Sequence, residues 1–118
     1  MRLRNNPDAM PFLQEHADLV FINPRDRLGK WHEVFGNDNP IAIEIGMGKG
    51  DFIIENARRN PNINFIGIEK YSTVLTIAVK KSLEMETLPN LRFMKEDAAV
   101  LGEVFAEGEI DTVYLNFS

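Results

Sequence analysis

The chain has no cysteine among its 118 residues, so it can form neither an internal disulfide bond nor a thiolate metal site. Histidine is scarce too. The two that occur, His16 and His32, lie far apart without ligand-like neighbours, so we expect no metal site. No apolar run is long enough to span a membrane, and the polar start MRLRNNPDAM lacks the apolar stretch of a signal peptide. We therefore expect a cytoplasmic protein that makes no membrane contact.

Positive charge is also in deficit, with 13 lysines and arginines against 18 aspartates and glutamates and a net charge of −5. The deficit is larger in residues 61–118, which hold 5 basic and 9 acidic residues. An acidic surface repels phosphate backbones, so the composition argues against nucleic-acid binding by this stretch and favours a cationic ligand. The length and a hydrophobic content of 44% predict one globular domain.

From residue 40 onward, apolar strand-like runs alternate with helical segments. The pattern predicts strands over 41–45, 64–70, 91–97 and 111–117, and helices over 51–61, 71–88 and 98–106. Such alternation predicts an α/β fold, a Rossmann-like parallel sheet with flanking helices and right-handed crossovers. We expect two parts, a helical lead-in over residues 1–40 and a cofactor-binding half over residues 41–118.

Two short helices are expected in the lead-in, over residues 7–20 and 26–36. The second should carry an apolar stripe, because four side chains recur at helical spacing: Leu28, Trp31, Val34 and Phe35. Trp31 is expected to pack in the core or as a cap, with base stacking as the alternative. At the other end of the chain, the strand over 111–117 is apolar on both faces. Without a further neighbour it becomes an exposed edge, so we expect the isolated chain to be poorly stable or to self-associate.

The segment IAIEIGMGKG leads a predicted strand into three glycines, Gly46, Gly48 and Gly50. Their G-x-G-x-G spacing differs by one place from the G-x-G-x-x-G of dinucleotide-binding loops. A pyrophosphate docks on the free N–H groups of a helix N-terminus, where a flanking acid such as Glu44 would repel it. S-adenosylmethionine carries an ammonium group, a sulfonium cation and no phosphate, so it suits this loop better.

Acidic residues stand at or near the ends of three predicted strands: Glu44, Glu69 and Asp97. In open parallel sheets the ligand binds beyond these ends, so Glu44 could hold the cationic end of the cofactor and Glu69 its ribose hydroxyls. Asp97 could accept a hydrogen bond from the adenine amino group. Structural alternatives stay open: Glu44 as a buried acid, Glu69 as a surface acid, and Asp97 as the cap of the following helix.

Three segments, GKWHEVFGNDNPIAIEIGMGKGDFI, NFIGIEK and VYLNFS, closely resemble the bacterial tRNA (guanine-N7-)-methyltransferases. The resemblance covers nearly the whole chain and implies transfer of a methyl group from S-adenosylmethionine to N7 of a guanine in the tRNA variable loop. It implies the S-adenosylmethionine-dependent methyltransferase fold, and it matches Glu44, Glu69 and Asp97 to the family's cofactor-contacting acids.

In that family the YLNFS segment continues into Asp-Pro-Trp-Pro and a basic stretch, which this chain does not contain. The resemblance therefore implies a fold truncated after the fourth strand, with tRNA bound mainly through a C-terminal half that is absent here. No catalytic residue is assigned within residues 1–118, and the chain alone is expected to be inactive.

Other classes of protein share a strand, glycine loop and helix of this kind. An NAD-dependent oxidoreductase would also place an acid at Glu69, although the glycine spacing and Glu44 disfavour it. A non-catalytic module that binds a nucleoside or RNA is a second alternative. Another methyltransferase, or an aminopropyl transferase, could have the same cofactor half.

Overall fold

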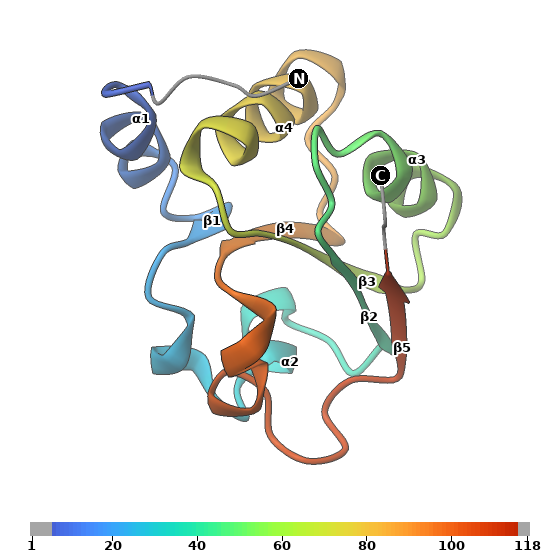
Figure 1. Ribbon diagram of the computed structural model, residues 1–118. Helices are drawn as coiled ribbons and strands as arrows, with labels where there is room; N and C mark the ends of the chain where they lie inside the picture. The colour runs from blue at the N-terminus through green and yellow to red at the C-terminus, as the bar shows by residue number, and fades with distance from the viewer. Residues whose placement is uncertain (1–5, 116–118) are drawn as a thin grey trace.

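The computed structural model describes residues 6–115 and shows a parallel sheet with helices on both faces (Figure 1). Within this range five strands lie in the order β1-β4-β3-β2-β5, and every neighbouring pair is parallel. The strands are β1 (Val20–Phe21), β2 (Ile41–Ile45), β3 (Asn64–Glu69), β4 (Leu91–Lys95) and β5 (Thr112–Leu115). The architecture confirms the predicted α/β class.

Four α-helices and two 3-10 helices connect these strands within the described range. They are α1 (Ala9–Glu15), η1 (Pro24–Arg27), α2 (Trp31–Phe35), α3 (Asp51–Arg59), α4 (Ser72–Met85) and η2 (Ala98–Glu103). Figure 1 shows α1, α3 and α4 on one side of the sheet and α2 on the other. None of these helices is long and apolar enough to cross a membrane.

The core consists of two apolar layers, one on each face of the sheet. On one face Ala42 and Phe65 pack with the buried side chains of α3 and α4. On the other face Ile43 and Ile66 pack with Trp31 of α2. Since β2 and β3 are buried on both sides, their sequences read as continuous apolar runs rather than as alternating patterns.

The predicted strands and helices between residues 41 and 95 are confirmed, with slightly shorter bounds. The helix α4 forms although its β-branched run has a poor helical propensity. Its side chains Leu75, Ala78 and Val79 are fully buried in the core. Tertiary packing of this face therefore outweighs the local preference of the run.

The lead-in departs from the prediction because it also contributes a strand. β1 begins at the last residue of the range predicted to be the first helix, and it pairs with β4 through Val20 opposite Phe93 and Phe21 opposite Met94. A strand of two residues is too short to show an alternating pattern. Its place in the sheet is set by its neighbour β4, which lies some seventy residues further along the chain.

Two other predicted helices were wrong in detail. The range 26–36 is divided between η1 and α2, and Leu28 in the gap is 46% exposed instead of lying on the buried stripe. Trp31 is fully buried as predicted, and its Nε1–H donates to the carbonyl of Val104 at 2.9 Å. The helix predicted over 98–106 is the shorter 3-10 helix η2, which is kinked at Val100.

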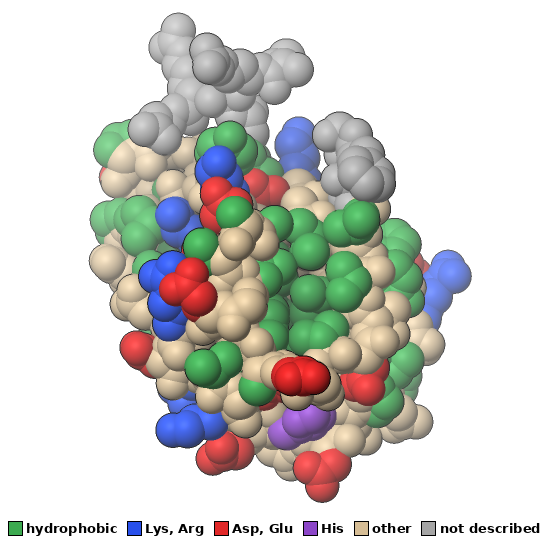
Figure 2. Space-filling model, turned by 60° about the horizontal axis from the view of Figure 1, so that its bottom comes forward, with side chains coloured by type: hydrophobic (Ala, Val, Ile, Leu, Met, Phe, Trp, Pro, Cys, Tyr) green, Lys and Arg blue, Asp and Glu red, His purple; other side chains and the backbone are tan. Residues whose placement is uncertain are grey.

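The strand β5 lies at the edge of the sheet, as the sequence predicted for a last strand. Its Val113 and Leu115 are 51% and 59% exposed. Figure 2 shows hydrophobic side chains gathered across the middle of the face that is turned forward in that view. Residues 116 and 117 of the predicted strand lie outside the described residues. Self-association through this edge stays a prediction.

Candidate functional site

The carboxyl ends of the strands share one edge of the sheet because all strands are parallel. At this edge β2 runs into the glycine loop, residues 46–50, and β3 ends at Glu69. β4 ends at Lys95, and Asp97 follows two residues later. Fold geometry thus brings the loop and two of the three predicted acids to the edge where open α/β sheets bind their ligands.

The glycine loop is shaped by its three glycines, which have φ angles of 71° at Gly46, 60° at Gly48 and 86° at Gly50. Side chains disfavour this left-handed region, so glycine suits all three places. The start of the loop is anchored to β3, because the N–H groups of Gly46 and Met47 donate to the carbonyl of Ile68 at 3.0 and 3.1 Å.

The glycines have different surroundings. A Cβ on Gly50 would lie 2.9 Å from the Cβ of Ala78, so Gly50 allows the start of α3 to pack closely against α4. A Cβ on Gly48 would meet no atom within 4 Å. Gly48 therefore borders open space, where a ligand could approach the backbone, whereas Gly50 has a packing role in the fold.

Glu69 links the glycine loop to the end of β3. It is only 7% exposed, so the alternative of a surface acid is wrong. One carboxylate oxygen accepts from the N–H of Gly48 at 3.1 Å, and the other accepts from the N–H of Tyr71 at 3.1 Å. Each oxygen has the capacity to accept a further hydrogen bond, as the predicted contact with two ribose hydroxyls requires.

Asp97 caps the helix η2, which confirms the structural reading of this residue. Its Oδ1 accepts from the N–H of Ala99 at 3.0 Å, and its Oδ2 lies 3.4 Å from the Nζ of Lys70. The Ala99 N–H, and then the Lys70 ammonium, hold the pKa of the Asp97 carboxyl below its usual range. The carboxylate stays ionised and half exposed at the sheet edge, so an additional contact with adenine stays a prediction.

Glu44 is the most enclosed of the three acids, with 2% exposure, and it precedes the last residue of β2. Since side chains alternate along a strand, it lies on the same face of the sheet as its register partner Gly67 and as Glu69. Charges interact more strongly at a buried position than in water. The burial of Glu44 fits the alternative of a buried acid, and a contact with the cationic end of the cofactor stays a prediction.

Two residues that the sequence analysis passed over also lie at this edge. Tyr71 is 61% exposed, and the Nζ of Lys70 lies 5.6 Å from the centre of its ring while also pairing with Asp97. Both directly follow Glu69 at the end of β3. Because ligands bind beyond strand ends in such sheets, their positions in the sequence could have marked them as candidate site residues. Among residues 6–115, no group of three histidine, aspartate or glutamate side chains is arranged to hold a metal ion.

Known proteins give a consistent set of similarities. Residues 38–118 match a family model described as "Putative methyltransferase". Over its full length the chain is 54% identical to a tRNA (guanine-N(7)-)-methyltransferase of Lachnoclostridium phytofermentans, of which it covers 54%. The chain spans about half the length of the curated relatives it matches, a second of which is the enzyme of that name from a Geobacillus species.

Solved structures share the fold at low sequence identity. An antibiotic-related methyltransferase superposes with a TM-score of 0.61 at 23% identity, over 76% of this chain and 46% of the other. A SAM-dependent methyltransferase from Thiobacillus denitrificans, in complex with S-adenosyl-L-homocysteine, superposes with a TM-score of 0.55 at 15% identity. That match covers 98% of this chain and 45% of the other, and at these identities it supports the fold alone.

Proposed function

This chain belongs to the methyltransferase family whose model matches residues 38–118, and from that premise we propose that it is the cofactor-binding half of a tRNA (guanine-N7-)-methyltransferase. The reaction transfers a methyl group from S-adenosylmethionine to N7 of a guanine in the variable loop of tRNA. The identity of 54% along the whole chain to a relative of that name carries the proposal. Family membership also decides against the NAD-dependent oxidoreductase.

The cofactor is assigned to the glycine loop and the acids beside it: Glu44, Gly46, Gly48, Gly50, Glu69 and Asp97. The Glu69 carboxylate accepts hydrogen bonds from the ribose hydroxyls while it keeps the hydrogen bond from the N–H of Gly48. The same carboxylate therefore holds both the loop and the ribose. Gly48 offers the open approach to the backbone, and Gly50 contributes through packing. Asp97 accepts from the adenine amino group, and Glu44 attracts the ammonium group.

The methyl transfer depends on the orientation of the two reactants rather than on a strong base. S-adenosylmethionine supplies, when bound, an electrophilic methyl group on a sulfonium ion. Guanine N7 already has a lone pair and carries no proton, so holding N7 in line with the methyl–sulfur bond contributes most. As positive charge moves to the purine, carboxylates that face it stabilise that charge. No residue among 1–118 is assigned as catalytic.

The tRNA contacts are assigned mainly to the part of the relatives' length that lies outside this chain. The acidic balance of residues 61–118 supports this division, because a phosphate backbone avoids a negatively charged surface. We assign no metal and no membrane to the function. Its place is the cytoplasm, where such a protein would meet tRNA.

Titration calorimetry with S-adenosylhomocysteine and with NAD tests the cofactor assignment. We expect S-adenosylhomocysteine to bind and NAD not to bind. Glu69→Gln should weaken binding by about 10-fold or more, because it removes a charge-assisted acceptor. Glu84→Gln, on the exposed face of α4, is the matched control and should change nothing. Equal affinities of the two variants would rule out the role given to Glu69.

The substrate assignment needs a separate measurement. A chain extended to the length of the relatives should form N7-methylguanosine in unmodified tRNA. If it binds S-adenosylhomocysteine but leaves tRNA unmodified, the cofactor assignment stands and the tRNA substrate is wrong.

A further inference from the structure

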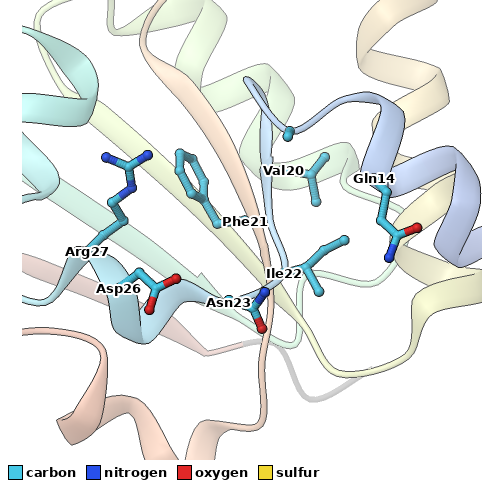
Figure 3. Close-up of a pocket in the computed structure, with 8 residues that line it drawn as sticks. Gln14, Val20, Phe21, Ile22, Asn23, Asp26 and Arg27 are labelled. Carbon is cyan, nitrogen blue, oxygen red and sulfur yellow. The ribbon is translucent and has the colours of Figure 1, made fainter.

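A pocket of about 380 Å³ lies beside β1, at the edge of the sheet furthest from β5 (Figure 3). Its walls come from the end of α1, from β1 with the two residues that follow it, and from η1. In Figure 3, Phe21, Asp26 and Arg27 lie on one side of β1, and Gln14 lies on the other side. The cofactor assignment above does not use this pocket.

The polar side chains that line the pocket are not used by the fold. Within residues 6–115, the side chains of Gln14, Asn23 and Asp26 make no hydrogen bond or ion pair. Arg27 has one side-chain interaction in this range, with its guanidinium carbon 5.6 Å from the centre of the Phe21 ring. Four hydrogen-bonding groups around one cavity are thus available to a ligand.

The pocket lies close to the edge that the cofactor is proposed to occupy. Phe21 pairs with Met94 in the parallel register, so the residues after β1 lie beside those after β4, which include Asp97. Neighbouring strands are about 4.8 Å apart. An ion pair of 3.2 Å between Arg25 and Glu103 also joins η1 to η2, the helix that Asp97 caps.

We propose that this pocket binds one unpaired guanine nucleotide of the RNA substrate, distinct from the guanine that is methylated. The inference rests on the proposed function, which supplies RNA as the ligand. The volume of the pocket falls within the range of about 300–1,000 Å³ that is usual for small-ligand sites. The pocket therefore suits a single nucleotide rather than an RNA helix.

The lining matches an extruded guanine in both stacking and hydrogen bonding. Unpaired RNA bases stack on aromatic rings and on guanidinium planes, and Arg27 held over Phe21 offers such a surface. The two oxygens of the Asp26 carboxylate match the adjacent N1–H and N2–H donors of guanine. The amide of Asn23 both donates and accepts, so it suits O6 or a sugar hydroxyl, whereas Gln14, on the other side of β1, is given no contact with the base.

Saturation-transfer NMR on the ligand protons of guanosine 5′-monophosphate tests the proposal, because it tolerates a chain that self-associates. We expect binding of this nucleotide and weaker binding of uridine 5′-monophosphate. Asp26→Asn should weaken the binding of guanosine monophosphate by about 10-fold, since a good bidentate hydrogen-bonded pair contributes a factor of that order. Arg27→Ala should weaken the binding of both nucleotides, because it removes the guanidinium on which either base would stack.

Arg25→Ala is the matched control, since Arg25 lies on the same short helix but pairs with Glu103 outside the pocket. It should leave both affinities unchanged, and circular dichroism should show that every variant is folded. The proposal is overturned if guanosine monophosphate does not bind, or if it binds equally to Asp26→Asn, Arg27→Ala and Arg25→Ala.

S-adenosylhomocysteine titrated into the same samples separates this inference from the proposed function. Its binding should be unaffected by Asp26→Asn, and it should not displace guanosine monophosphate. If S-adenosylhomocysteine binds and the nucleotide does not, the pocket assignment fails and the cofactor assignment stands. If only the nucleotide binds, with the dependence on Asp26 described above, the cofactor assignment fails and the pocket remains.

Discussion

Replacing Gly50 by alanine should destabilise the chain much more than the same replacement two residues earlier. Gly50 has a φ of 86°, and an alanine in this left-handed region costs about 1–2 kcal/mol. The new methyl group would also lie 2.9 Å from the Cβ of Ala78 and 3.3 Å from Cδ1 of Ile54. Overpacking of this kind adds about 1–3 kcal/mol. We therefore expect a total loss of about 2–5 kcal/mol in the free energy of unfolding.

Gly48→Ala is the matched control within the same loop. Its φ of 60° brings a similar backbone cost, but its methyl group would meet no atom within 4 Å. The two variants should therefore differ by about 1–3 kcal/mol, the overpacking part alone. Urea unfolding followed by the fluorescence of Trp31, the single tryptophan of the chain, measures both values.

A double variant isolates the contact itself. In Gly50→Ala with Ala78→Gly, the two methyl groups no longer meet, so the double variant should be more stable than the sum of the single effects predicts. The coupling should be about 1–3 kcal/mol. Additive effects, or a Gly48→Ala variant as unstable as Gly50→Ala, would refute the packing role of Gly50.

Three further predictions concern other parts of the fold. Asp97→Ala should lower the melting temperature more than Asp97→Asn, because asparagine keeps an acceptor for the Ala99 N–H; thermal unfolding of the two variants compares them. Hydrogen bonds from two arginines of α3 lower the pKa of Glu55 from 4.5 to about 2, so its stabilising effect is present above pH 4.5 and is lost towards pH 2. Glu55→Gln should lack this part of the pH dependence in urea unfolding between pH 5 and pH 2. Trp31→Phe should cost about 1–3 kcal/mol, measured by circular dichroism in urea, since it leaves the Val104 carbonyl without its buried donor.

The glycine loop shows how far local patterns reach. The strand β2, the loop and the helix α3 follow each other in sequence, and each has its own local signal, so their order and bounds were predicted. Local patterns did not reveal that Gly50 packs on a residue of the next helix, or that the N–H of Gly48 is held by Glu69. Both contacts join residues more than twenty positions apart.

The acids show the same division. The strand-end position of Glu69 followed from the apolar run before it, but its burial and its two backbone partners depend on how the loop folds over β3. For Asp97 the local alternative, a helix cap, is confirmed because capping involves only neighbouring residues.

By itself, the sequence determined the fold class, the order of the elements after residue 40, and the identities of the acids near the strand ends. It could do so because apolar periodicity, glycine and capping residues act over a few positions. Only the tertiary structure decided that β1 joins the sheet beside β4, and that a pocket lies between α1, β1 and η1. Those features depend on which distant segments meet, and no local preference of the chain encodes that choice.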